Sequence, residues 1–285
     1  MVPAVISKII SMQPSLTMSE NQIAQYVINH ADKVANSTIT YIAKKTGTSE
    51  ASINRFCKKV GYKGFNGFKV ALAQENFYSS IQNQQMEEQE DGTIGSVAKD
   101  YTNVLVSTSA MLDEDILEKA VTAMQRAESI YILCLDSTAV VAKDLELKLN
   151  LVDIGARCVE QLSMMKVFAS NVHENDLVIV IVPTILMKDI YQTVVTCKDR
   201  GAKILTITSY DSPKLNQLVD YKFVTSDKIT TQNAIALSNN LAFLYTTDVI
   251  YCAMLQKDKS LLQKKLASDV ILSDQNLVDH YMLEY

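Results

Sequence analysis

The sequence predicts a small all-helical domain followed by an α/β domain, a three-layer sandwich with a parallel sheet at its centre. Apolar residues recur at helical spacing through the first 80 residues. Beyond residue 128, short apolar runs alternate with helical segments, which is typical of a parallel sheet covered on both faces. With 285 residues, the chain is long enough for two domains with separate cores.

The composition is that of a globular protein. Apolar residues make up 48% of the chain and charged residues 21%, with 8 Gly and 4 Pro, which excludes collagen-like and wholly disordered chains. The apolar runs are shorter than the roughly 20 residues that a membrane helix needs. The first twelve residues lack a charged head, a long apolar run and a cleavage site, so we expect no secretory signal and a cytoplasmic protein.

The cysteines and histidines form no recognisable site in the sequence. Three histidines are scattered along the chain, and no CxxC pair occurs. Metal sites need ligands at close, characteristic spacings, so we expect neither a metal ion nor another cofactor. We interpret the cysteines as reduced, buried residues; they lie at positions 57, 134, 158, 197 and 252.

Positive charge is concentrated at the amino-terminal end. The chain carries a net charge of −5, but residues 1–80 contain nine Lys or Arg against four Asp or Glu. Residues 81–285 contain 18 against 28, so this part is acidic. A basic module in an acidic chain indicates an anionic partner for that module.

Four helices are predicted in the amino-terminal region, and the last of them follows two glycine-containing turns and runs to about Tyr78. The first begins at Ser19, whose hydroxyl could cap it while the side chain of Gln22 reaches back. The second covers residues 38–46 and ends at Gly47, because glycine readily adopts the left-handed conformation that closes a helix. The third begins with Ser49 as its cap and runs to about residue 60.

The second and third of these helices fit a helix-turn-helix. This motif needs a small residue where the helices cross, a turn that tolerates positive φ, and apolar residues between the helices. Ala43 and Gly47 meet the first two requirements. Ile42, Ile53 and Phe56 supply the apolar contacts.

The outer face of this motif is cationic. Between residues 44 and 69 there are seven Lys or Arg and a single acid, Glu50. Attraction to phosphate is therefore built into one small module, which favours binding to double-stranded DNA. The alternative is a three-helix interaction module whose lysines only keep it soluble.

The exposed residues of the third helix are candidate DNA contacts. In a helix-turn-helix the start of the second helix meets base edges, while flanking residues bind backbone phosphates. Arg can bind guanine through two hydrogen bonds, and Asn can pair with adenine. We therefore expect base contacts from Ser49, Ser52, Asn54 and Arg55, and contacts to phosphate from Lys58, Lys59 and Lys63. Thr48, in the turn before this helix, is a further expected DNA contact.

A polar stretch separates the two predicted domains. Residues 79–93 have no hydrophobic stripe and are acidic toward their end, which is typical of a linker or an exposed helix extension. The predicted division is a helix-turn-helix domain at 1–78, this linker, and an α/β domain at 94–285.

Strands and helices alternate in the second domain. Strands are predicted at residues 129–135, 156–159, 177–182, 203–208 and 221–224. Helices are predicted at residues 94–111, 114–126, 139–152, 163–171, 188–200 and 233–255. The final segment, 261–285, is predicted to be a helix at a subunit interface.

Residues 38–69 resemble the helix-turn-helix of the RpiR-type bacterial transcriptional regulators. The resemblance lies in Ser49, Ile53, Arg55 and Phe56, followed by Gly61, Tyr62, Gly64, Phe65 and Phe68. It extends over nearly the whole chain, because that family joins this module through a linker to a sugar-isomerase-type (SIS) domain that binds phosphosugars. The resemblance implies a homodimer or homotetramer that reads a palindromic operator, controls carbohydrate-metabolism genes and responds to a phosphosugar.

Two loops are expected at the carboxyl edge of the predicted sheet, where α/β domains bind ligands. The loop after the first strand carries Ser137 and Thr138, and the loop after the third strand carries Thr184 and Lys188. Hydroxyl groups, a cation and helix N-termini attract phosphate, so these four residues are candidates for binding an effector.

Both loops depart from the pattern of the SIS family. That pattern has glycine and serine in the first loop and a Ser- and Thr-rich, glycine-containing cradle in the second. Here Asp136 places a negative charge in the first loop, while in the second Pro183 lacks an N–H and Ile185 is bulky. Two interpretations stay open: the pocket binds an altered ligand, or the domain has lost its effector and serves as a dimerisation scaffold.

Catalysis is a third possibility, because the SIS fold also serves sugar isomerases. Aldose–ketose isomerisation needs a base close to the sugar. His173 and Glu174 lie before the third predicted strand, at the opposite edge from the expected site. We therefore assign no catalytic residue and expect a regulator without enzymatic activity.

Overall fold

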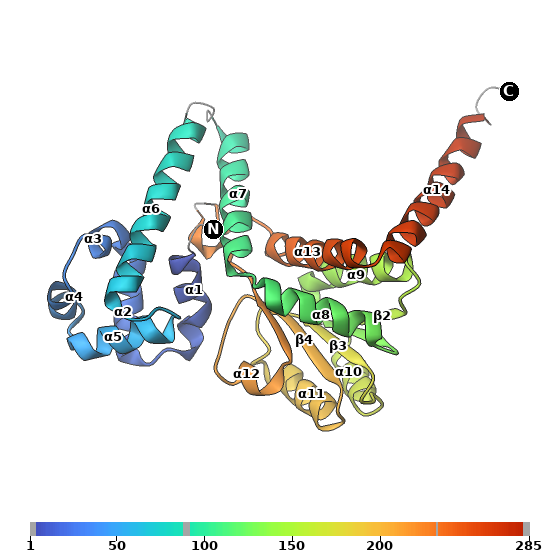
Figure 1. Ribbon diagram of the computed structural model, residues 1–285, viewed down its shortest axis with the longest axis horizontal. Coiled ribbons are helices and arrows are strands. Elements are labelled where there is room, and N and C mark those ends of the chain that lie inside the picture. The colour runs from blue at the N-terminus through green and yellow to red at the C-terminus, as the bar shows by residue number, and fades with distance from the viewer. Residues whose placement is uncertain (1–3, 88–91, 232, 282–285) are drawn as a thin grey trace. The chain divides into compact units, whose positions relative to one another are not determined.

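The computed structural model describes residues 4–87, 92–231 and 233–281, which form two compact units (Figure 1). The first unit lies within residues 1–112, 208–217 and 223–242. The second lies within residues 113–207, 218–222 and 243–285. The predicted fold class is confirmed, because the amino-terminal region is helical and the remainder carries a parallel sheet with helices.

Helices around one hydrophobic core form the amino-terminal part of the first unit. They are α1 (Val5–Met12), α2 (Met18–Asn29), α3 (Ala31–Ala35), α4 (Ile39–Thr46), α5 (Glu50–Lys59) and α6 (Phe65–Glu87), with a 3₁₀ turn at Gln13–Ser15. In the core the rings of Phe56 and Phe68 meet edge to face, with centroids 6.2 Å apart. Tyr62 packs on Phe68 in the same way at 5.5 Å. This aromatic cluster anchors α5 to the start of α6.

The start of α2 differs from the prediction. Thr17 is the N-cap: its hydroxyl accepts a hydrogen bond from the Glu20 N–H at 3.3 Å, and the Glu20 carboxylate accepts one from the Thr17 N–H at 2.8 Å. The predicted capping box of Ser19 and Gln22 is therefore wrong by two residues. A carboxylate suits this position better than an amide, because the helix N-terminus carries partial positive charge.

Helix α6 extends into the stretch that was expected to be a linker or a helix extension. It continues to Glu87, and α7 (Thr93–Met111) begins at the end of that stretch. Residues 88–91 of the predicted linker lie outside the described residues.

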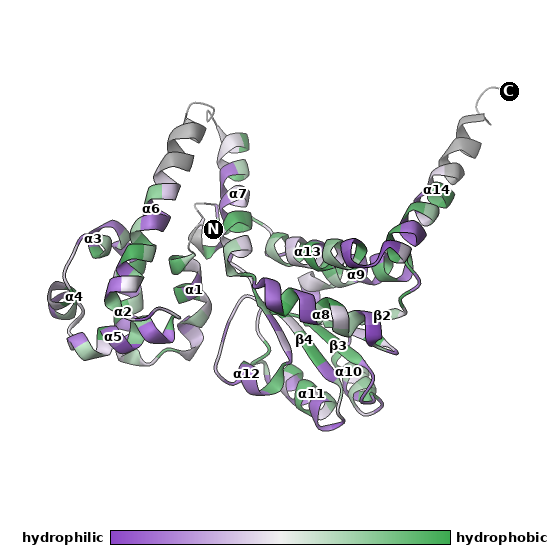
Figure 2. Ribbon diagram, viewed as in Figure 1, coloured by the Kyte–Doolittle hydropathy of each residue, from purple (hydrophilic) through white to green (hydrophobic). Residues whose placement is uncertain are grey.

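A five-stranded parallel sheet forms the centre of the α/β part, in the order β2-β1-β3-β4-β5. The strands are β1 (Ile130–Cys134), β2 (Ala156–Val159), β3 (Leu177–Ile181), β4 (Lys203–Thr208) and β5 (Tyr221–Val224). These bounds confirm the five predicted strands. Every residue of β3 is buried, and Figure 2 shows this strand as hydrophobic, as expected for a central strand covered on both faces.

Helices connect and follow these strands. They are α8 (Glu114–Arg126), α9 (Ala139–Asn150), α10 (Leu162–Ala169), α11 (Lys188–Asp199), α12 (Leu215–Leu218), α13 (Leu241–Lys257) and α14 (Lys259–Tyr281), with 3₁₀ turns at Asp136–Thr138 and Lys228–Thr230. The last of them confirms that the carboxyl-terminal segment is helical over its described residues.

The long helix predicted at 233–255 begins later than expected, at Leu241. The prediction is wrong at its start because Asn233 is bound to α7 of the first unit. Its backbone N–H and its side-chain amide both donate to the carboxylate of Asp100, at 2.9 and 2.8 Å, and the amide also donates to Ser96 Oγ at 2.8 Å. Asp100 is only 4% exposed, so these bonds to a buried carboxyl group hold the segment outside the helix.

Candidate functional site

Helices α4 and α5 have the geometry that a helix-turn-helix requires. Gly47 ends α4 in the left-handed region at φ 64°, and the N–H of Thr48 returns to the carbonyl of Ala43 at 3.0 Å. Ser49 caps α5 by accepting a hydrogen bond from the Ser52 N–H at 3.1 Å. The turn is therefore built as the sequence predicts, with glycine at the position where a side chain would be strained.

Threonines occupy two turn positions where apolar residues are more usual. The hydroxyl of buried Thr46 donates to the carbonyl of Ile42 at 2.9 Å, and it lies 2.8 Å from the hydroxyl of Thr48. Thr48, a predicted DNA contact, is thus half-buried and engaged with its neighbour. These bonds satisfy the polar atoms that the turn would otherwise bury unpaired.

Three of the predicted base contacts lie together on the exposed start of α5. The hydroxyls of Ser49 and Ser52 are 2.9 Å apart, and Arg55 donates through Nη2 to Ser52 Oγ at 3.0 Å. Ser49 and Arg55 are exposed, and Ser52 is partly exposed. The guanidinium is therefore held at the surface by a hydroxyl, with further donors available to a base edge.

Asn54 has a structural partner. Its Oδ1 accepts a hydrogen bond from the N–H of Phe65 at 2.9 Å, which satisfies a free backbone donor at the start of α6. A Cβ at Gly64 would lie 2.9 Å from the same oxygen, and Gly64 has φ 151°, so glycine is needed beside this contact. The amide oxygen of Asn54 is thus engaged within the protein, although the residue is exposed.

The three lysines expected at phosphates differ in their surroundings. Lys58 and Lys63 are exposed and have no hydrogen-bond or ion-pair partner within the described residues. Lys59 is bound to α2: its Nζ lies 2.7 Å from Glu20 Oε2 and donates to the carbonyl of Ser15 at 3.2 Å. Lys59 therefore has a packing role that Lys58 and Lys63 lack.

The ion pair with Lys59 is reflected in the titration of Glu20. Partial burial acts to raise the pKa of Glu20, but the hydrogen bonds from Lys59 and Thr17 outweigh it and hold the pKa below the usual value. Glu20 thus links the cap of α2 to the end of α5.

The two loops proposed for effector binding meet at the carboxyl edge of the sheet. Their strands, β1 and β3, are paired neighbours. The hydroxyl of Thr138 accepts from the Leu135 N–H at 3.1 Å and donates to the carbonyl of Ile181 at 2.8 Å. Thr138 is 0% exposed, so its hydroxyl joins the loops to each other and is not presented to solvent.

The other predicted effector residues lie closer to the surface. Ser137 is exposed and follows Asp136, which adopts the left-handed region at φ 47°. Thr184 is half-buried, and its hydroxyl accepts from the Leu186 N–H at 3.2 Å. Lys188 is exposed at the first position of α11, where backbone N–H groups are also free of intrahelical bonds.

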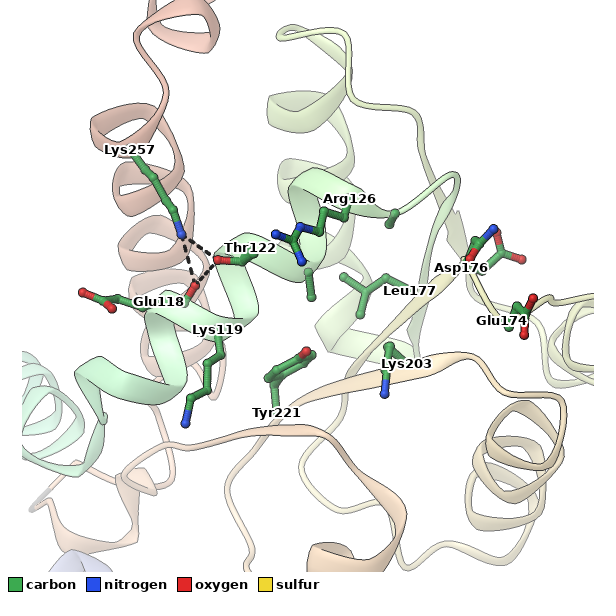
Figure 3. A pocket seen from close by; sticks show the side chains of 13 residues that line it. Glu118, Lys119, Thr122, Arg126, Glu174, Asp176, Leu177, Lys203, Tyr221 and Lys257 are labelled. Carbon is green, nitrogen blue, oxygen red and sulfur yellow. Dashed lines mark hydrogen bonds between the residues drawn. The ribbon is translucent and has the colours of Figure 1, made fainter.

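A cavity of ≈ 460 Å³ lies at the opposite edge of the sheet (Figure 3). Leu177, Lys203 and Tyr221, which begin β3, β4 and β5, contribute to its lining. Lys257 donates to the hydroxyl of Thr122 at 2.6 Å beside it. The remaining lining residues are Glu118, Lys119, Ala123, Arg126, Ala127, Glu174, Asn175 and Asp176.

The charge of this cavity is mixed. Four cationic side chains face three acidic ones, and the lining comes from α8, α13 and the starts of three strands. None of the four predicted effector residues lines it. Sequence reasoning missed the cavity because no local motif marks it and tertiary packing alone assembles its walls.

Among the described residues, no group of three or more His, Cys, Asp or Glu side chains could hold a metal ion. Within the same part of the chain, no helix is long and apolar enough to span a membrane.

Two family models match this chain. Residues 4–79 match the helix-turn-helix domain of the rpiR family, and residues 123–253 match the SIS domain. The uncharacterized HTH-type transcriptional regulator CPE0189 of Clostridium perfringens is 27% identical over 265 residues, covering 90% of this chain and 95% of that protein. The HTH-type transcriptional regulator HexR of Pseudomonas aeruginosa is 25% identical over 211 residues, covering 73% and 74%.

Solved structures show the same fold. The Vibrio vulnificus NanR protein, complexed with ManNAc-6P, has a TM-score of 0.59 at 22% identity and covers 95% of this chain and 98% of its own. The sugar isomerase domain of an RpiR transcription factor from Sphaerobacter thermophilus has a TM-score of 0.54 at 16% identity, covering 64% and 97%.

A helix-turn-helix module joined to a parallel α/β domain of this kind defines a transcriptional regulator. The exposed cations Arg55 and Lys58 on α5 agree with that class. The chain belongs to the RpiR-type regulators, with an amino-terminal rpiR helix-turn-helix and a carboxyl-terminal SIS domain.

Proposed function

We propose that the protein binds a palindromic DNA operator through α5 and controls genes of carbohydrate metabolism. The observation that carries this proposal is the exposed row of Ser49, Ser52 and Arg55, flanked by the unpaired cations Lys58 and Lys63. Hydroxyls and a guanidinium can read base edges, while free ammonium groups bind phosphate. In this proposal residues 1–78 bind DNA, residues 79–93 connect, and residues 94–285 sense a ligand and assemble subunits.

Selection of binding sites from random duplexes, followed by fluorescence anisotropy, tests this proposal. Arg55→Ala is expected to cost about 1 to 3 kcal/mol and to relax the sequence preference. Lys58→Ala is expected to weaken all duplexes alike and to reduce the slope of affinity against salt by about one. Lys259→Ala, which removes an exposed charge on α14, is the control and should leave binding unchanged.

Two results would remove this assignment. One is an Arg55→Ala protein with unaltered affinity and unaltered preference. The other is a wild-type protein that selects no duplex at low ionic strength, where phosphate attraction is strongest.

The ligand proposed for the SIS domain is a phosphosugar or a related metabolite at the carboxyl edge of the sheet. Its support is the exposed Lys188 at the start of α11, with Thr184 in the loop that precedes this helix and Ser137 in the loop after the paired strand β1. The solved NanR relative, which is complexed with ManNAc-6P, supports the same class of ligand. Thr138 would act indirectly, by holding the two loops together, because its hydroxyl is engaged.

A scaffold without a ligand is the second candidate for this domain. Ile185 and Thr138, one in each loop, are fully buried, and the charge of Asp136 repels an anion. These observations favour a domain in which the protein's own side chains take the place of a ligand. A thermal-shift panel of phosphosugars separates the two. A rise of several degrees with one compound, lost in Thr184→Ala, supports ligand binding, whereas an unresponsive panel supports the scaffold.

We do not propose an isomerase. His173 and Glu174 precede β3, which begins at Leu177, and thus lie at the amino edge of the sheet. The relatives CPE0189 and HexR are named as transcriptional regulators. Isomerase assays with the purified protein test this directly, and turnover of a phosphosugar would contradict it.

We further propose that the protein is a homodimer or homotetramer that acts in the cytoplasm, where operator DNA is found. Helix α14 supports assembly, because apolar side chains stand exposed along it; these are Leu262, Leu266, Val270, Ile271 and Leu272. Light scattering tests the assembly, and Leu266→Asp is expected to shift the protein toward monomer.

A further inference from the structure

Two cysteine side chains meet on neighbouring strands of the sheet. The Sγ atoms of Cys134 and Cys158 are 3.4 Å apart, within hydrogen-bond contact. Cys134 is the last residue of β1, and Cys158 lies in the edge strand β2, where it is paired with Ile132. Because side chains alternate along a strand, Cys134, two residues beyond Ile132, faces the same side as Cys158. The parallel pairing thus directs the two thiols toward each other.

The two thiols differ in their access to solvent. Cys134 is 0% exposed, whereas Cys158 is half-buried at the edge of the sheet. Cys158 is therefore the more accessible residue of the pair. The remaining cysteines provide internal comparisons, since Cys57 and Cys197 are buried and Cys252 is exposed.

The surroundings of the two thiols also shift their pKa values in opposite directions. The hydrogen bond with Cys134 lowers the pKa of Cys158, helped by the charge of Lys143 and opposed by burial and by Glu146 and Glu160. The same hydrogen bond, together with burial, raises the pKa of Cys134. Lys143 belongs to α9 and is paired with Glu160 at 2.6 Å. Cys158 is thus the better nucleophile, because the thiolate is the reactive form.

We propose that Cys134 and Cys158 form a redox-active dithiol, a modification site that a small peroxide oxidises to an intramolecular disulfide. Its basis is the contact between the two thiols at the edge of the sheet, so it is independent of DNA or effector binding. A disulfide needs its sulfur atoms about 2.0 Å apart, so the two Sγ atoms must approach by about 1.4 Å.

The chemistry balances with hydrogen peroxide as the oxidant. The Cys158 thiolate attacks one peroxide oxygen, the O–O bond breaks, and the departing hydroxide takes up a proton to become water. The Cys134 sulfur then attacks the Cys158 sulfur of the resulting sulfenic acid. The S–S bond forms, the S–O bond breaks, and the thiol proton of Cys134 leaves with the hydroxyl as a second water. Two thiols are oxidised by two electrons, and one peroxide is reduced to two waters.

The disulfide would join the end of β1 to the edge strand β2. Cys134 leads directly into the Leu135–Thr138 loop, in which Asp136 already adopts the left-handed φ of 47°. A covalent link at this position would restrain the residue from which the loop departs.

Peptide mapping of the full-length protein tests the proposal. Reduced protein is treated with a small molar excess of hydrogen peroxide, the remaining thiols are blocked with N-ethylmaleimide, and the digest is analysed by mass spectrometry. Peptides linked through Cys134 and Cys158, and separated again by dithiothreitol, are expected to form before exposed Cys252 is modified. Oxidation of Cys252 ahead of the pair, or folded protein that yields no linked peptides, would overturn the proposal.

Variants distinguish the attacking thiol from the resolving one. Cys134→Ser is expected to stop at a sulfenic acid on Cys158, which dimedone traps, while Cys158→Ser should slow oxidation of Cys134 by about tenfold or more. Cys252→Ser is the control and should form the disulfide as wild type does. An unchanged rate of Cys134 oxidation in Cys158→Ser would contradict the assigned order. Circular dichroism checks folding, and the wild-type map remains decisive if a variant unfolds.

Discussion

Glu75 gives the amino-terminal helices a pH dependence that can be measured. This residue lies in α6, and its Oε2 accepts hydrogen bonds from the backbone N–H groups of Val5 at 2.7 Å and Ile6 at 3.3 Å, at the start of α1. Burial raises the pKa of Glu75 from 4.5 to about 7, although these hydrogen bonds and the charge of Lys8 oppose the rise. Between pH 4.5 and about pH 7, the carboxyl group of Glu75 therefore keeps its proton in the folded protein but has lost it in the unfolded chain.

The sign and size of the effect follow from this difference. Below pH 4.5, Glu75 is protonated in both the folded and the unfolded protein, and its contribution to the free energy of unfolding is largest. As the pH rises to about 7, only the folded state keeps the proton, so the free energy of unfolding falls. At about 1.4 kcal/mol for each pH unit, the total loss is roughly 3 kcal/mol above pH 7.

Glu75→Gln removes this titration while keeping an oxygen that can accept the two hydrogen bonds. At pH 8 the variant is expected to be more stable than wild type. Between pH 4.5 and pH 8, the difference in the free energy of unfolding between variant and wild type should change by up to about 3 kcal/mol in favour of the variant. Hydrogen exchange of peptides from α1 and α6, corrected for the intrinsic pH dependence, reports this local stability.

A matched control has the opposite sign. The pKa of Glu20 is lowered by its partners, so its contribution is present at neutral pH and is lost as the pH falls. Glu20→Gln should therefore cost more stability at pH 8 than at acidic pH. If Glu75→Gln changes protection equally at pH 4.5 and pH 8, the burial argument for Glu75 is refuted.

Three further predictions concern the packing of the first unit. Lys59→Ala is expected to cost about 1 kcal/mol in urea unfolding through loss of the ion pair to α2, whereas Lys58→Ala should cost nothing measurable; equal effects would contradict their different surroundings. Phe56→Ala should cost about 3 to 5 kcal/mol in the same assay, because the ring is fully buried, and a loss below about 1 kcal/mol would refute its place in the core. Asn233→Ala should cost about 1 to 3 kcal/mol and reduce hydrogen-exchange protection in α7, because its amide donates to buried Asp100; unchanged protection would show that this contact does not hold the segment.

The strands and the helix-turn-helix could be predicted because their signals are local. Short apolar runs marked all five strands, and Gly47 with Ser49 marked the turn between α4 and α5. Two helix starts were predicted wrongly. At α2, two capping patterns overlap within a few residues, and the one containing the carboxylate of Glu20 is formed. At α13, a hydrogen bond to Asp100, 133 residues away, removes Asn233 from the helix.

The candidate site was predictable as a surface but not residue by residue. Residue type and helical spacing indicate that Arg55, Lys58 and Lys63 are exposed, and each is exposed in the structure. The same reasoning treats Asn54 and Lys59 as equivalent contacts. Their partners, Phe65 and Glu20, lie on other helices, so helical spacing alone could not reveal them.

The sequence by itself determined the order of the domains, the class of each fold and the cationic character of α5, because periodicity, glycine placement and charge are properties of neighbouring residues. Only the tertiary structure decided which side chains remain available for a ligand. Thr138 is occupied by the carbonyl of Ile181, 43 residues away, and the Cys134 and Cys158 thiols meet across 24 residues. Such contacts arise because parallel strands distant in the chain are paired side by side in one sheet.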